Sequence, residues 1–188
     1  MRDVKHLLGP QGPLRKDLIP SREAEALEMP DIVLSEGLYD RLREEALKRD
    51  VSVEELVVDA LLKTLNISLD PSERVELHVK LSEKFLQEAG GFLAKGDYVQ
   101  ASEKGWGAVA QVVKALAAKE GRELRGHRDL WLYVDELAEE LKDRELRRLW
   151  RSANTLHQNF YENWMPPRDV VDAMDDVKRL AEKLRKLL

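Results

Sequence analysis

The feature that most constrains the fold is a series of five segments whose apolar residues recur every three or four positions. Such spacing places apolar side chains along one face of an α-helix, which must then be buried against other helices. Glycine or proline marks three of the four breaks between the segments, at Gly96, Gly121 and Pro166. The segments span about residues 70–95, 98–119, 129–142, 145–164 and 167–188. Short connections between amphipathic helices predict an all-α fold, an antiparallel bundle of four or five helices over residues 70–188.

Composition narrows the possible functions. The 188 residues contain 43% apolar residues, enough for a packed core, and no cysteine, which excludes disulfides, thiolate zinc sites and cysteine nucleophiles. Charged residues make up 36%, with many Glu, Lys and Arg, a bias that fits a thermophile. The net charge of −5 argues against indiscriminate binding to duplex DNA. His6, His78 and His127 show no ligand spacing, so we expect neither a metal nor another cofactor.

Targeting and membrane signals are not evident in the sequence. No apolar run approaches the roughly 20 residues of a membrane-spanning helix. The first residues lack the apolar centre of a secretion signal. We therefore expect a cytoplasmic protein without a membrane partner.

The region before the bundle divides into two parts. Residues 1–28 are rich in proline and glycine and predict an extended arm. In residues 29–66, a strand is expected at 31–34, and two helices follow, the second opened by a capping box of Ser52 and Glu55. This order resembles a degenerate ribbon-helix-helix unit, a family that dimerises and reads DNA through its strand. Acidic residues around the strand would repel phosphates, so the alternative is a small packing or dimerisation appendage.

The fourth bundle segment, residues 145–164, carries the candidate functional residues. Leu149, Ala153, Leu156 and Phe160 share one helix face and predict a core stripe. Arg151 lies opposite that stripe. A strip of helix surface between these two faces, here called the shoulder, combines aromatic and polar residues, namely Trp150, Asn154, His157 and Tyr161. Asparagine is a poor helix former and needs a partner, which makes this shoulder a candidate site.

Arg151 and His157 are separated by five residues on the fourth helix of the predicted bundle. This spacing resembles the Arg-x4–6-His motif of the HEPN superfamily, and residues 95–104 look like the usual start of its second helix. Residues 156–162 and 164–167 are similar to the archaeal PaREP family. The HEPN resemblance implies a metal-independent endoribonuclease, of the toxin–antitoxin, defence or RNA-processing type. It assigns proton transfer to His157, phosphate binding to Arg151 and a supporting role to Asn154.

Helix geometry adds a requirement to this resemblance. Six residues of α-helix span about 9 Å and about 120° of rotation, so one chain's Arg151 and His157 cannot easily grip the same phosphate. Two copies facing across a twofold axis can form one composite cleft, which predicts a homodimer. RNA is the expected ligand, with Arg147, Arg148 and Tyr161 as substrate-binding residues, and an antitoxin or a nucleotidyltransferase-like protein is a possible partner.

Two other functions remain open from the sequence. His157 can be a hydrogen-bonded structural histidine and Arg151 a solvated arginine, in which case the chain is a non-catalytic HEPN bundle that binds a partner protein or a nucleotide. The third possibility is a transcriptional regulator that uses the N-terminal unit. Arg122, Arg125, His127 and Arg128 are expected as solvated loop charges that can widen an RNA footprint.

Overall fold

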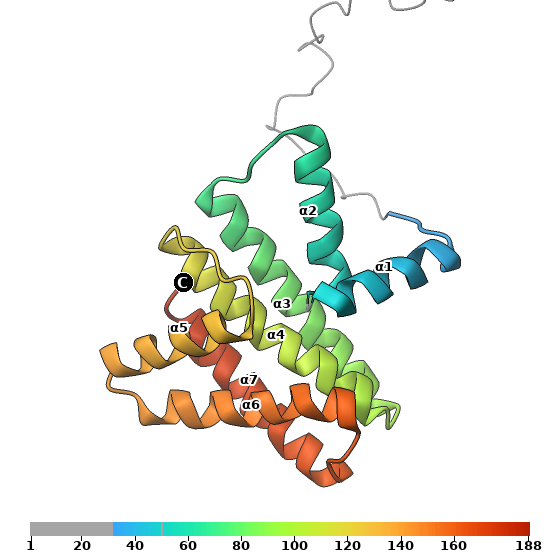
Figure 1. Ribbon diagram of the computed structural model, residues 1–188. Helices are drawn as coiled ribbons and strands as arrows, with labels where there is room; N and C mark the ends of the chain where they lie inside the picture. The colour runs from blue at the N-terminus through green and yellow to red at the C-terminus, as the bar shows by residue number, and fades with distance from the viewer. Residues whose placement is uncertain (1–31, 50) are drawn as a thin grey trace, which may run out of the picture. The chain divides into compact units, whose positions relative to one another are not determined.

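The computed structural model describes residues 32–49 and 51–188, and within these ranges the chain is all-α (Figure 1). No strand occurs in the described residues, which confirms the all-α part of the predicted fold class. The helices are α1 (Glu36–Arg49), α2 (Val53–Leu65), α3 (Pro71–Ala94), α4 (Tyr98–Lys119), α5 (His127–Glu140), α6 (Arg144–Glu162) and α7 (Pro167–Arg185).

The prediction of a strand at residues 31–34 is wrong for residues 32–34, the part of it that the structure describes. Residues 32–35 have no regular secondary structure, and Asp31 and the predicted arm at 1–28 lie outside the described residues. A single strand leaves its backbone N–H and C=O groups unpaired, and a ribbon-helix-helix strand pairs only with a second subunit. The predicted strand-helix-helix appendage therefore consists, in the described part of the chain, of α1 and α2.

Two helices begin where the sequence predicts them, through reciprocal capping boxes. The Ser52 side chain accepts a hydrogen bond from the Glu55 backbone N–H at 3.1 Å, and the Ser52 N–H donates to the Glu55 carboxylate. Asp70 and Glu73 form the same arrangement at the start of α3, with Pro71 in the first helical position. Each box satisfies backbone N–H groups that a helix start would leave without partners.

The core is built around α4, which packs against α3, α5, α6 and α7 (Figure 1). Ala101, Gly105, Ala108, Val112 and Ala115 lie at spacings of three and four along α4 and are all buried. Gly105 marks the closest approach, because a Cβ added there would lie 2.3 Å from the Met174 sulfur on α7. Small side chains on α4 therefore allow its neighbours to approach closely.

Residues 36–188 form one compact unit that includes α1 and α2 as well as the bundle. The other unit, residues 1–35, is described only at residues 32–35. The predicted boundary between residues 66 and 70 falls in the connection from α2 to α3 and stays a prediction. None of the helices in the described ranges combines the length and apolar character needed to cross a membrane.

A buried polar network joins α2 to α3 and α4. The His78 ring nitrogen Nδ1 donates to the Gln111 side-chain oxygen at 2.7 Å, and Gln111 in turn hydrogen-bonds the Glu55 carboxylate. Lys114 forms an ion pair with the same carboxylate. Burial raises the pKa of Glu55, but the Lys114 ammonium and the hydrogen bonds together lower it by more than burial raises it. The net shift of the pKa is therefore downward. The Glu55 carboxylate is therefore held in its ionised form.

The same network gives the fold a pH-dependent stability through His78. Burial lowers the pKa of His78 below its usual value of 6.5, and the hydrogen bond to Gln111 offsets only part of that effect. Between the folded and unfolded pKa values the unfolded chain binds more protons, so the free energy of unfolding falls as the pH drops below about 6.5. We expect His78→Gln to flatten this dependence in urea unfolding between about pH 5 and pH 8. Equal pH dependence in both proteins would contradict this assignment.

Candidate functional site

Two histidines from different helices meet side by side. The Nε2 atom of His157, on α6, lies 2.6 Å from the Nε2 atom of His127, the first residue of α5. At this distance one ring must donate an N–H and the other must accept it, so the contact holds one proton. A second proton on the contact would place two N–H groups against each other. The pair can therefore store a proton and exchange it.

Aromatic side chains fix the orientation of both rings. The Trp106 ring centroid lies 5.3 Å from that of His127 and 5.2 Å from that of His157. Tyr161 packs edge-on against His157, with centroids 5.1 Å apart. Trp150 packs at a tilt against Trp106, with ring centroids 4.9 Å apart. Such contacts restrict ring rotation and so hold the histidine pair in one geometry.

His157 reaches a small cavity of about 100 Å³, whereas His127 does not line it. The cavity lies between the α1–α2 turn, α3, α4 and α6. Its lining residues are Leu47, Val51, Ser52, Glu55, Phe85, Glu103, Lys104, Trp106, Gly107, Gln111, His157, Phe160 and Tyr161. Charged and polar groups line the cavity beside aromatic rings, so a polar ligand that enters it would meet His157 first and His127 only through His157.

The structure brings some of the predicted site residues together and separates others. Tyr161 contacts His157 and is 56% exposed, so it stands at the edge of the cavity. Arg151 is exposed on another face of α6 and does not line the cavity at His157. Asn154 is half-buried and forms no side-chain hydrogen bond to another described residue. One chain therefore presents His157 and Tyr161 together, without Arg151.

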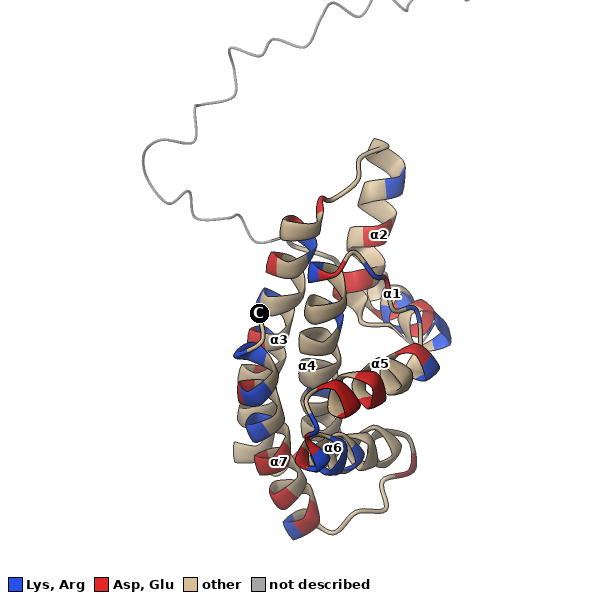
Figure 2. Ribbon diagram, turned by 90° about the vertical axis from the view of Figure 1, so that its left-hand side faces the viewer, with Lys and Arg blue, Asp and Glu red and all other residues tan. Residues whose placement is uncertain are grey.

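Arg147 and Arg148 are held in ion pairs on the outer side of α6. Arg147 pairs with Asp135, at 2.7 Å, and with Glu139, both on α5. Arg148 pairs with Asp176 of α7 at 3.4 Å. Figure 2 shows this arrangement as a basic stretch of α6 next to an acidic stretch of α5. Carboxylates within the chain thus neutralise both arginines.

Sequence reasoning missed His127 and misjudged Trp150. His127 was expected in a solvated loop, but it begins α5, three residues before the buried Leu130 and seven before the buried Val134. That helical spacing is the signal that could have identified an inward-facing His127. Trp150 was expected on the shoulder between the core stripe and the face of Arg151, but it is 1% exposed, because its side chain fills the space between Trp106 and Trp131.

Potential metal ligands do not cluster in the residues that the structure describes. No group of three or more His, Cys, Asp or Glu side chains in that part of the chain could hold a metal ion. The histidine pair alone supplies two possible ligands.

Comparison with known proteins relates these observations to a family. No curated protein matches the chain. The crystal structure of a protein from Sulfolobus solfataricus is similar, with 28% sequence identity and a TM-score of 0.51 over 57% of this chain and 95% of that one. The model of the archaeal PaREP1/PaREP8 family matches residues 77–181, which include His127 and His157. The predicted resemblance to PaREP is thereby confirmed, and the chain belongs to the archaeal PaREP1/PaREP8 family.

Proposed function

We propose that this protein is a HEPN-like, metal-independent endoribonuclease that acts on cytoplasmic RNA, in RNA processing or in a toxin–antitoxin or defence system. One observation carries the proposal: His157 faces a cavity while its Nε2 atom contacts His127 Nε2 at 2.6 Å. Acid–base catalysis requires a group that can take up and return a proton near neutral pH, and histidine is the side chain best suited to it.

The proposed reaction is an internal transesterification of RNA. His157 takes the proton of a ribose 2′-hydroxyl, whose oxygen attacks the adjacent phosphorus. The bond from phosphorus to the 5′-oxygen of the next nucleotide breaks, and that oxygen receives a proton from the histidine pair. The products are a 2′,3′-cyclic phosphate and a 5′-hydroxyl. His127 acts through His157, because it fixes the ring and shares its proton.

Phosphate binding in this proposal comes from a second copy of the chain. Arg151 and His157 point to different sides of the same helix, so a single α6 does not hold both on one phosphate. A twofold homodimer that brings two α6 helices together would place Arg151 of each chain near His157 of the other. Arg151 would then stabilise the charge that develops on the phosphate oxygens.

A mixing experiment tests the composite site. Arg151→Ala and His157→Ala are each expected to cleave RNA far more slowly than the wild type, all assays containing a chelator. After the two variants are mixed and allowed to exchange subunits, half of the dimers carry one intact site of two, so activity should return to about a quarter of the wild-type value. An unmixed sample of each variant is the control.

The mixing experiment also separates the alternatives. A mixture that stays as inactive as its components would exclude a site shared between chains. A wild-type protein that leaves RNA intact would exclude the nuclease, and a wild type that loses activity in the chelator would exclude metal-independent cleavage.

A second candidate is a non-catalytic bundle that binds a partner protein, such as an antitoxin or a nucleotidyltransferase-like protein. The observation in its favour is that α1 and α2 expose apolar side chains, among them Leu38, Tyr39, Leu61 and Leu65. The regulator alternative is less favoured, because residues 32–35 lack the strand with which a ribbon-helix-helix protein reads DNA.

A further inference from the structure

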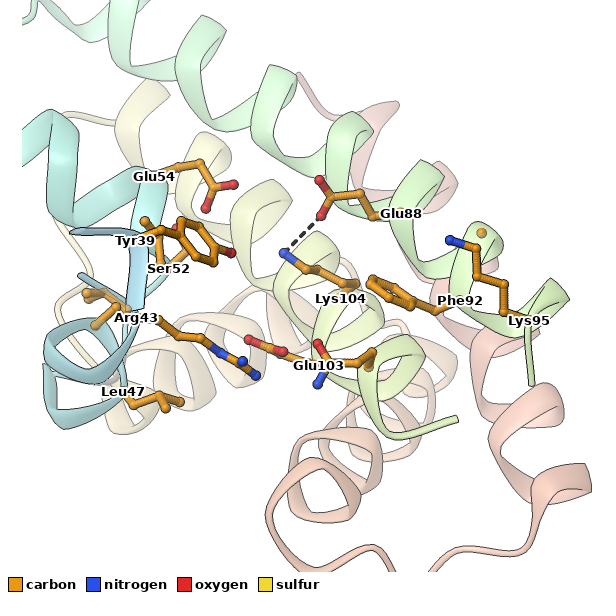
Figure 3. A pocket seen from close by; sticks show the side chains of 15 residues that line it. Tyr39, Arg43, Leu47, Ser52, Glu54, Glu88, Phe92, Lys95, Glu103 and Lys104 are labelled. Atoms are coloured by element: carbon orange, nitrogen blue, oxygen red, sulfur yellow. Dashed lines mark ion pairs between the residues drawn. The ribbon is translucent and has the colours of Figure 1, made fainter. Parts of the chain in front are cut away.

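A second cavity, of about 390 Å³, adjoins the cavity at His157. It lies between α1, the α1–α2 turn, α3 and α4 (Figure 3). The two cavities share five lining residues, Leu47, Val51, Ser52, Glu103 and Lys104. A chain-like ligand whose reacting bond lies at His157 would therefore continue into this larger space.

Two of the carboxylates in the larger cavity are neutralised within the chain. Glu54 forms an ion pair with Lys84. Glu88 forms ion pairs with Lys84 at 3.7 Å and with Lys104 at 2.9 Å, the latter visible in Figure 3. These two carboxylates consequently repel an anion only weakly.

Two further cations, Arg43 and Lys95, stand on the same walls. Arg43 and Lys95 are exposed and form no ion pair with a described residue. The Arg43 guanidinium points towards the Glu103 carboxyl in Figure 3, and the Lys95 ammonium lies 5.8 Å from the centre of the Phe92 ring. The Lys95 charge is therefore available to an anion that enters from solvent, whereas Arg43 also acts on the Glu103 carboxyl.

Glu103 offers little opposition to such an anion. Burial raises the pKa of the Glu103 carboxyl, and Lys104 and Arg43 offset only part of that effect. With Glu103 ionised, the three cations that line the cavity, Arg43, Lys95 and Lys104, equal the three carboxylates Glu54, Glu88 and Glu103 in number. The cavity walls are thus not acidic overall, although the protein has a net charge of −5.

Aromatic side chains complete the lining. Tyr39 from α1 and Phe92 from α3 both border the cavity, and Tyr39 is partly exposed. Single-stranded nucleic acids bind where cations follow the phosphates and aromatic rings offer faces on which bases can stack. The volume is also in the range of pockets that hold a ligand the size of a nucleotide.

We infer that this cavity is the subsite for the single-stranded RNA next to the cleaved bond, with Arg43 and Lys95 on its phosphates and Tyr39 or Phe92 against a base. The inference rests on the proposed endoribonuclease function, because it treats His157 as the point of cleavage. It places the RNA beneath the α1–α2 pair, on residues of the same chain as His157.

Binding of a short RNA with a 2′-O-methyl group on every ribose tests the subsite, because this probe cannot undergo the transesterification. Affinity is measured by fluorescence anisotropy over a range of salt concentrations. Each phosphate contact on a single strand contributes a slope of about 0.7 to the fall of log affinity with log salt concentration. We expect Arg43→Ala and Lys95→Ala each to weaken binding several-fold and to reduce the slope by about 0.7. Arg168→Ala, an exposed arginine on α7 outside the cavity, is the matched control and should change neither quantity.

The outcomes of this test separate the subsite from the proposed activity. Wild-type binding that depends on Arg43 and Lys95, in a protein that fails to cleave unmodified RNA, would support the subsite and overturn the nuclease. Cleavage of unmodified RNA together with equal probe binding by wild type and both variants would overturn the subsite alone. Absence of wild-type binding would also overturn the subsite. Unchanged thermal unfolding of each variant shows that its fold is intact.

Discussion

His157→Ala lowers the rate of RNA cleavage by a factor of about 10² to 10⁴, the usual contribution of one acid–base group. The expected loss is large because His157 is the ring of the histidine pair that lines the cavity, so no other imidazole reaches the same point. The measurement is kcat/KM on a labelled RNA, with the wild type and the variant at equal concentration. Gln158→Ala, the exposed neighbour on α6, serves as control and should retain wild-type activity.

The same assay distinguishes a catalytic His157 from a structural one. Thermal unfolding of His157→Ala must stay close to that of the wild type for the loss to be assigned to chemistry. His127→Asn, whose side chain can still hydrogen-bond His157, should retain more activity than His127→Ala and shift the pH profile of cleavage. Wild-type activity in His157→Ala would refute the proposed reaction.

Trp150→Ala lowers the free energy of unfolding by about 3–5 kcal/mol, as expected when a large aromatic side chain is removed from a core. Trp150 is 1% exposed and packs against Trp106 and Trp131, so its loss leaves a cavity between α4, α5 and α6. Trp106 also touches both histidines, and so the same change should loosen the histidine pair. Urea unfolding followed by circular dichroism gives the free energy.

Trp164→Ala is the matched control for this prediction. Trp164 is 51% exposed, so its replacement should change the free energy of unfolding by less than about 1 kcal/mol. Equal effects of the two replacements would contradict the assignment of Trp150 to the core. A large effect of Trp164→Ala on self-association, measured by sedimentation, would instead place Trp164 in the proposed dimer contact.

The helices of the bundle could be predicted from sequence because their boundaries depend on local chemistry. Asp70, Pro71 and Glu73 are sufficient to begin α3, and Gly121, with φ of +71°, follows the end of α4 as expected. The fourth bundle helix was predicted to run to residue 164, but it ends at Glu162. Asn163 adopts a left-handed conformation there and its N–H bonds to the Asn159 carbonyl at 2.8 Å, an ending that does not need proline.

The candidate site could be predicted only in part, because it depends on contacts between distant segments. The apolar stripe and shoulder of α6 follow from helical spacing, and they correctly separated Arg151 from the core. The contact between His127 and His157 joins residues thirty positions apart, and it requires the relative placement of α5 and α6. The pairing of Arg147 with Asp135 has the same origin. Periodicity within one helix carries no information about either contact.

The Glu55 carboxylate has a consequence for how ligands reach the site. It closes the capping box of α2, pairs with Lys114 of α4 and lines the His157 cavity at the same time. Movement of the α1–α2 turn away from α4 therefore breaks the ion pair that holds this carboxylate against the bundle. We expect any opening of the cavity on the side of this turn to occur together with fraying of the first turn of α2.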